Sequence, residues 1–104
     1  MQRQIIHYLV EGDNAPNLSV RFSGLNLADY SAITMRVALE TTNRRFARPV
    51  EPDPNDPELG VVEWHDNDLV EGNHRAEFEF EAASGVIFTL PQKYPVILAV
   101  RRDL

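Results

Sequence analysis

The stretch from residue 74 to residue 82 constrains the fold most, because apolar and acidic residues alternate along it from residue 76 onward. Side chains of a β-strand point to opposite faces in turn, so this pattern predicts a strand with one buried and one solvated face. A helix would need apolar residues at spacings of three and four, which the alternation does not provide. The predicted core face carries Ala76, Phe78, Phe80 and Ala82, and the predicted outer face carries Glu77, Glu79 and Glu81.

Two further apolar runs follow this strand and predict a three-stranded antiparallel meander. Ser84 and Gly85 provide a turn signal, and residues 86–90 are predicted to form the next antiparallel strand. Pro91 and Pro95 then interrupt the path before residues 96–100 form the last strand.

Five more strands are predicted upstream, at residues 4–10, 18–22, 33–39, 46–50 and 61–64. Turn signals at spacings of about 8–12 residues are typical of a β-sandwich, although a small barrel remains possible because strand order cannot be read from the sequence. Trp64 is expected to fill the space between two sheets. Residues 24–30 are predicted to cap one end of the core through Leu25, Leu27 and Tyr30. Residues 51–60 contain three prolines, so we expect an exposed loop that protrudes.

Length and composition predict a single domain over residues 1–104, with a core large enough to fold without crosslinks. The chain has no cysteine, which excludes disulfides and thiolate chemistry. Its formal net charge of −6 argues against nucleic acid as a partner. The first residues lack the apolar core of a signal peptide, and no apolar run approaches the ~20 residues that span a bilayer, so no membrane partner and no signal-directed export are expected.

Three groups of residues invite a site. Asp53, Asn55, Asp56 and Glu58, and separately Asp66, Asp68 and Glu71, offer oxygen ligands that calcium prefers, but the spacing departs from an EF-hand and solvated loops are the favoured interpretation. His7, His65 and His74 are not placed on one strand face, so surface or strand-end positions are expected.

The remaining chemistry points away from an enzyme. The serines lack the flanking glycines of a nucleophile elbow. The row Glu77, Glu79 and Glu81 lies on one strand face instead of across a cleft, so it predicts a solvated face or a surface for a basic partner. We expect no catalytic residue, no metal and no cofactor.

A series of short segments runs in order along almost the whole chain. It comprises Gly12-Asp13, Ala15-Pro16 and residues 18–22, then 27–37 and 60–64, then Asp66, Asp68 and 72–78, and finally Gly85, Thr89, Pro91, Tyr94-Pro95 and 96–100. This series resembles the immunoglobulin-like domain of tailed-phage baseplate upper proteins and related tail-fibre proteins. The resemblance implies an immunoglobulin-like antiparallel β-sandwich of about seven strands. It also implies a non-enzymatic virion protein, an adaptor or decoration subunit assembled into the tail apparatus in the host cytoplasm.

The expected partners are other virion structural proteins and further copies of the chain, arranged as a ring. Residues 96–100 are apolar at every position, which indicates burial on both faces, so Ile97 and Leu98 are predicted interface residues. Coverage of one face by the chain ends or by residues 24–30 is the alternative explanation. Asp53, Asn55 and Asp56 are predicted to contact a neighbouring subunit from the proline-rich loop.

A carbohydrate-binding module is the second functional hypothesis. Sugar binding asks for exposed aromatic rings on which pyranoses stack. It would require Tyr8, Tyr30 or Tyr94 to line a groove with Trp64.

Overall fold

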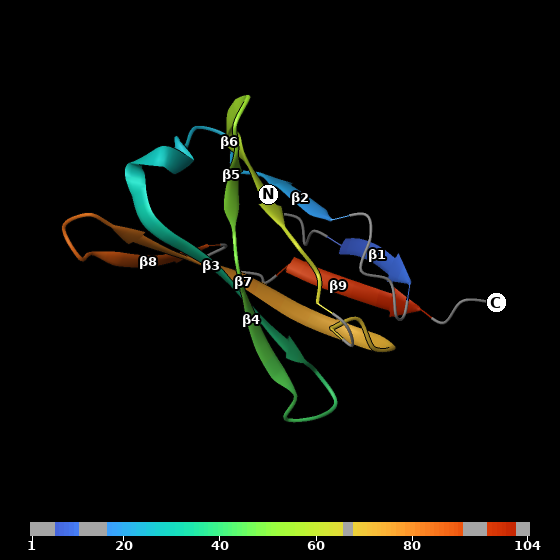
Figure 1. The fold of residues 1–104 in the computed structure, drawn as a ribbon. Coiled ribbons are helices and arrows are strands. Elements are labelled where there is room, and N and C mark those ends of the chain that lie inside the picture. Colours follow the sequence, from blue (N-terminus) through green and yellow to red (C-terminus); the bar gives the residue numbers. More distant parts are fainter. Residues whose placement is uncertain (1–5, 11–16, 66–67, 91–95, 102–104) are drawn as a thin grey trace, which may run out of the picture.

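The chain folds into two β-sheets packed face to face (Figure 1). The computed structural model describes residues 6–10, 17–65, 68–90 and 96–101. The larger sheet has the order β1-β9-β7-β3-β4, with β8 also paired to β7, and the smaller sheet has the order β2-β6-β5. The bounds are β1 Ile6–Val10, β2 Leu18–Arg21, β3 Tyr30–Leu39, β4 Arg45–Pro49, β5 Glu51–Asp53, β6 Asp56–Val62, β7 Gly72–Ala82, β8 Ile87–Leu90 and β9 Val96–Arg101, with a short 3-10 helix η1 at Leu27–Asp29.

The strand order is that of an immunoglobulin-like sandwich, which confirms the predicted fold class. The smaller sheet joins the second, sixth and fifth strands, as B, E and D are joined in that fold, and β9-β7-β3-β4 follows G, F, C and C′. Two details differ from the prediction. There are nine described strands instead of about seven, and β1 pairs with β9 in parallel while the other pairings are antiparallel.

The predicted closing strands form, but they are not a meander. β8 pairs with the C-terminal half of β7, where Phe80 lies opposite Phe88, and β9 pairs with its N-terminal half, where His74 lies opposite Leu98. Both strands therefore lie along the same edge of β7. An 11-residue strand is long enough to accept two short partners in succession, which a pattern of apolar runs cannot reveal.

The core lies between the sheets and is built on the alternation of β3 and β7. Met35 lies opposite Phe78 and Ile33 opposite Phe80, and all four side chains are buried. Phe22, which follows β2 in the smaller sheet, meets Phe78 and Phe80 edge-to-face at centroid distances of 5.1 and 5.2 Å. Each fully buried side chain of this size stabilises the fold by about 1.5–3 kcal/mol. The predicted core face is thereby confirmed from Ala76 to Phe80, while Ala82 at the end of β7 is half-buried.

The other predicted core residues are also found in place. Trp64 is 5% exposed and belongs to the core cluster, directly after β6. Leu27 is buried, while Leu25 and Tyr30 are partly buried against the same cluster, as expected of a segment that closes one end of the core.

The prediction that residues 51–60 form a loop outside the sheets is wrong. They form β5 and most of β6, a hairpin whose tip projects from the body in Figure 1. β5 is an edge strand, so Pro52 can direct its donor-less nitrogen away from β6. Pro57 falls at the irregularity between the pairs Pro52–Gly60 and Asp53–Asp56, where the ladder needs no donor. β6 is the middle strand of the smaller sheet, but Pro57 precedes its residues Leu59 to Val62 that pair with β2, so neither proline interrupts a ladder on both sides.

Candidate functional site

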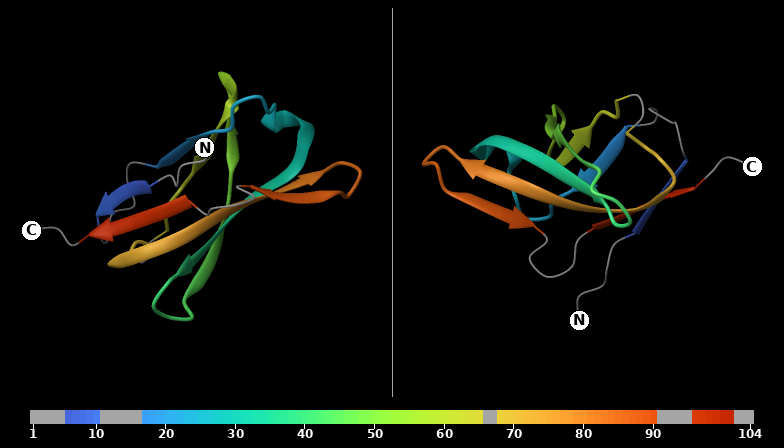
Figure 2. Two further views of the ribbon diagram at one scale, coloured as in Figure 1. Left: turned by 180° about the vertical axis from the view of Figure 1, so that it is seen from behind. Right: turned by 90° about the horizontal axis from the view of Figure 1, so that it is seen from below.

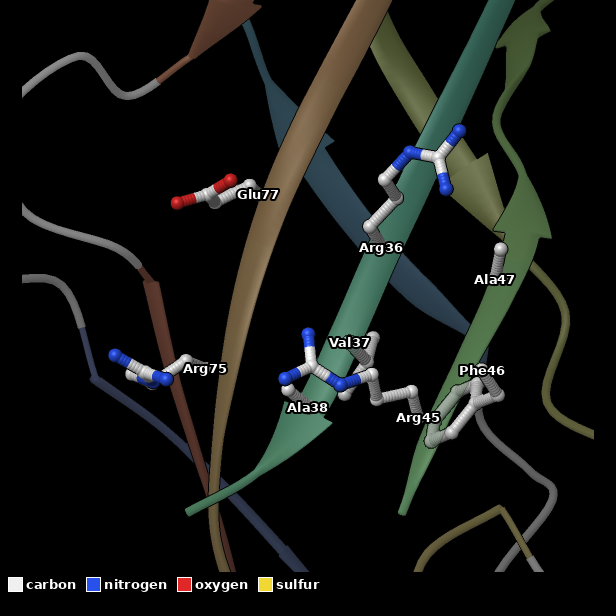
Figure 3. A pocket seen from close by; sticks show the side chains of 8 residues that line it. All are labelled: Arg36, Val37, Ala38, Arg45, Phe46, Ala47, Arg75 and Glu77. Atoms are coloured by element: carbon white, nitrogen blue, oxygen red, sulfur yellow. The ribbon is translucent and has the colours of Figure 1, made fainter. Parts of the chain in front are cut away.

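A shallow hollow of about 450 Å³ lies on the outer face of the larger sheet, over β3, β4 and β7 (Figure 3). Its position is set by the strand register. Ala38 of β3 lies opposite Arg45 of β4 and opposite Arg75 of β7, so these three residues form one row across the sheet. The next row is Ala47, Arg36 and Glu77. The small side chains of Ala38 and Ala47 leave the space, and the long arginines surround it.

The arginines of the hollow differ in their partners. Arg36 forms an ion pair with Glu79, with Nε 3.1 Å from a carboxylate oxygen. No ion pair or side-chain hydrogen bond joins Arg45, Arg75 or Glu77 to the rest of the described chain. In Figure 3 the Arg45 side chain extends from β4 across Ala38, toward the strand that carries Arg75. The Arg75 side chain extends away from Arg45, beyond β7 in this view, so the two cationic groups border the hollow at separate places within a protein of net charge −6.

Guanidinium groups present several N–H donors in a planar fork that matches the oxygens of a carboxylate or a phosphate. The hollow can therefore bind an anion. It offers no paired acid and base for proton transfer, since its titratable acid is a single glutamate among arginines.

The acidic residues of the β5–β6 hairpin form ion pairs and hydrogen bonds that stabilise the hairpin and attach it to β2. Arg21 of β2 binds Asp56 at 2.6 Å and Glu58 at 3.3 Å. Glu58 also accepts the Gly24 N–H at 2.8 Å, and Asp53 accepts the Asn55 N–H at 2.7 Å. Hydrogen bonding from Arg21 holds the pKa of Asp56 below its ordinary value. These contacts account for the first acidic group without an ion, and within the described part of the chain no three metal-ligating side chains gather. Whether Asp53, Asn55 and Asp56 contact a neighbouring subunit stays a prediction.

The second acidic group contains a buried ion pair, not a solvated cluster. Asp68 is 2% exposed, and its carboxylate accepts one hydrogen bond from Nε of Arg48, at 2.8 Å, and another from Nη2 of the same side chain. It also accepts the His65 N–H at 2.8 Å. Phe46 lies beneath the Arg48 guanidinium, 5.0 Å from its centre, so the segment after β6 is attached to β4. The expectation of a solvated loop is wrong for Asp68, because β4 presents its arginine toward this segment.

The histidines also differ from the prediction. His65 is exposed, as expected, but His74 is 1% exposed and lies in β7 between Leu39 and Leu98 of the neighbouring strands. Neither ring nitrogen has a hydrogen-bond partner in the described structure. Burial lowers the pKa of His74, and the charge of Arg44 acts in the same direction. His74 lies two residues before Ala76, where the alternation of apolar and acidic residues begins, so that alternation does not assign its face. His7 has no described side chain.

Ile97 and Leu98 are buried within the single chain, at 8% and 1% exposure. β9 lies between β1 and β7, and Leu98 belongs to the core cluster. The apolar run of residues 96–100 therefore has an explanation inside the fold, and an interface at these two residues stays a prediction.

The aromatic groove of the carbohydrate hypothesis does not form from the described rings. Trp64 is in the core, and Tyr30 packs edge-to-face on Phe80 at 5.1 Å. Tyr8 and Tyr94 have no described side chains.

No family model and no curated protein matches the chain. No helix in the described residues is both long and apolar enough to cross a membrane. The arginine-lined hollow is the site that sequence reasoning missed, since Arg36, Arg45 and Arg75 are distant in the chain. The signal that could have found it is the register: all three occupy outward positions of alternating strands.

Proposed function

We propose that this chain is a non-enzymatic structural subunit of a tailed-phage virion, an immunoglobulin-like adaptor or decoration module of the baseplate or tail-fibre apparatus. The observation that carries the proposal is the strand order of the sandwich, β9-β7-β3-β4 over β2-β6-β5. It agrees with the fold of the phage family that the sequence resembles along almost its whole length.

The use of charged residues supports a structural role. The ion pairs of Arg21 and Arg48 attach the β5–β6 hairpin and the segment after β6 to other strands. Their acids thereby stabilise the positions of loops, which in a module of this kind present surfaces to neighbours.

The arginine-lined hollow is the surface we propose for docking an acidic segment of a neighbouring virion protein. Arg45 and Arg75 are exposed and lie in one row with Ala38, so an acidic segment lying across β3 and β7 would accept hydrogen bonds from each of them. Electrostatic complementarity of this kind fixes orientation and speeds association, and it weakens with added salt.

The test is the composition of purified particles. Virions from cells that carry the gene are expected to contain the protein in a fixed ratio to the portal protein, measured by quantitative mass spectrometry. The double variant Arg45→Glu/Arg75→Glu should remain folded by circular dichroism and be lost from particles. Ser19→Glu, which adds a carboxylate at an exposed position of β2 in the smaller sheet, is the control and should be retained. Absence of the wild-type protein from particles would refute the proposed function, while equal incorporation of both variants would refute only the docking surface.

A further inference from the structure

The hairpin formed by β7 and β8 projects from one end of the molecule (Figure 1 and Figure 2). Exposed apolar residues lie near its turn. Val86 is 62% exposed and Ile87 is 56% exposed. The turn is well formed, since Ala82 N–H donates to Val86 O and Gly85 N–H to Ala82 O, both at 2.9 Å. Gly85 adopts φ of 88°, the left-handed conformation that this turn requires. Local disorder therefore does not explain the exposure of these apolar side chains.

Edge strands present unpaired backbone groups, and proteins usually protect them with proline, charge or local irregularity. Three edges with described side chains are protected in this way. β5 contains Pro52, and β2 carries Arg21 with its ion pairs. β4 ends in Pro49, and its Ala47 carbonyl is occupied by Nη1 of Arg48 at 2.7 Å.

β8 itself has none of these protections, and the nearest proline, Pro91, comes after its last residue. The run from residue 86 to residue 90 is Val-Ile-Phe-Thr-Leu, without proline or charge. Within the described structure β8 pairs only with β7. Residues of this type favour strands strongly.

The register shows which backbone groups point outward. Ala82 and Val86 form a hydrogen-bonded pair, and such pairs alternate along an antiparallel ladder. Phe88 and Leu90 therefore bond to β7, while the N–H and C=O groups of Ile87 and Thr89 point away from it. These outward groups lie two residues apart on a strand edge that no other described strand covers.

We infer that the β8 edge pairs with the β8 edge of a second copy of this chain, antiparallel about a two-fold axis at Phe88. Ile87 of one copy then lies opposite Thr89 of the other, and each such pair exchanges two backbone hydrogen bonds. Val86 lies opposite Leu90, and Phe88 meets its counterpart. Every side chain of the contact meets an apolar or β-branched side chain, the combination that stabilises cross-strand pairs.

A second copy is the occupant that the edge fits, because a two-fold contact requires one surface to complement itself. The run from residue 86 to 90 complements itself in its outward hydrogen-bonding groups and in its charge. Its two outward residues are symmetric about Phe88, and it lacks charge, so copies with net charge −6 do not place like charges on the shared edge. The pairing joins two larger sheets into one. It holds whether or not the chain belongs to a virion.

The decisive experiment uses cross-linking, since the chain has no cysteine of its own. Ile87→Cys and Thr89→Cys are made as separate variants, at side chains that are both exposed. In the proposed register the two positions are a hydrogen-bonded pair with Cα atoms about 5.5 Å apart, within the range that a disulfide bridges. Identical positions are diagonal neighbours about 7–8 Å apart, beyond that range.

A mixture of the two variants, mildly oxidised, is therefore expected to form a covalent dimer faster than either variant alone. Equal cross-linking in all three samples would overturn the register, and no cross-linking in any would overturn the pairing.

Analytical ultracentrifugation tests the same edge without cysteine. The wild-type chain should show a concentration-dependent dimer, and Ile87→Lys should weaken it by about tenfold or more, which corresponds to 1.4 kcal/mol. Ser19→Lys, a lysine placed on exposed edge strand β2, is the matched control and should leave the dimer unchanged. A wild-type chain that sediments as a monomer at every concentration, or a dimer that Ile87→Lys leaves intact, would overturn the proposal.

Discussion

Replacing Asp68 with Asn should destabilise the protein by about 3 kcal/mol, because the substitution removes the charge that balances a partly buried arginine. The Asp68 side chain is 3% exposed and that of Arg48 is 18% exposed, so neither group is well solvated. The amide introduced by Asp68→Asn would keep an acceptor for the His65 N–H but could accept only one of the two Arg48 bonds. Breaking one partner of a buried pair costs about 3–5 kcal/mol, and the retained bonds place this variant at the lower end.

The assay is urea denaturation followed by tryptophan fluorescence, since Trp64 in the core reports on unfolding. Glu79→Gln is the control, because it breaks the ion pair with Arg36, whose side chain is 60% exposed. Exposed pairs contribute about 0–1 kcal/mol. A double-mutant cycle that adds Arg48→Met, which keeps much of the contact with Phe46, should give a coupling of about 2–3 kcal/mol. If Asp68→Asn costs no more than Glu79→Gln, the argument that this pair attaches the loop is wrong.

Three further predictions concern the core. Phe80→Ala should cost about 3–5 kcal/mol in the same assay, since Phe80 is 0% exposed, and a cost below that of Glu79→Gln would show that the strand faces are wrongly assigned. Gly60→Ala should lower the free energy of unfolding by about 1–3 kcal/mol, because the added Cβ would lie 2.5 Å from Val50. A Val50→Ala background should recover part of this loss, and no recovery would show that the strain lies elsewhere. The pKa of His74 is lowered in the fold, so the unfolded chain takes up the proton first as pH falls. The melting temperature should therefore decrease below about pH 6.5, and His74→Leu should show a weaker decrease; parallel curves would contradict the burial argument.

The strands that could be predicted well are those with strict alternation. β3 and β7 show period two over most of their length, and their buried faces match the prediction from Ile33 to Leu39 and from Ala76 to Phe80. Where local rules conflict with long-range pairing, the prediction failed. The chain passes at the buried Val50 from β4 in one sheet to β5 in the other. Pro52 lies in that edge strand, and Pro57 lies in β6 before the residues that pair with β2, so both prolines are tolerated.

The candidate site could not be predicted, because it depends on register. Arg36, Arg45 and Arg75 come together only when β3 is placed between β4 and β7 with Ala38 shared by both pairings. A shift of one residue in either pairing would turn one strand's arginine toward the core, so the constraint that creates the core also determines the composition of the outer face.

The strand register also changes the interpretation of the glutamates on the outer face of β7. Taken along β7 alone, Glu77, Glu79 and Glu81 form an acidic face for a basic partner. Across the sheet, Arg36 forms an ion pair with Glu79, and Arg75 precedes Glu77 on the same outer face of β7. One end of this face is therefore cationic while the chain as a whole is acidic. The acidic segment that we propose as a partner would bind at this end, away from the negative charges on the rest of the surface. Because Arg45 and Arg75 are exposed, that binding should be strongest at low salt.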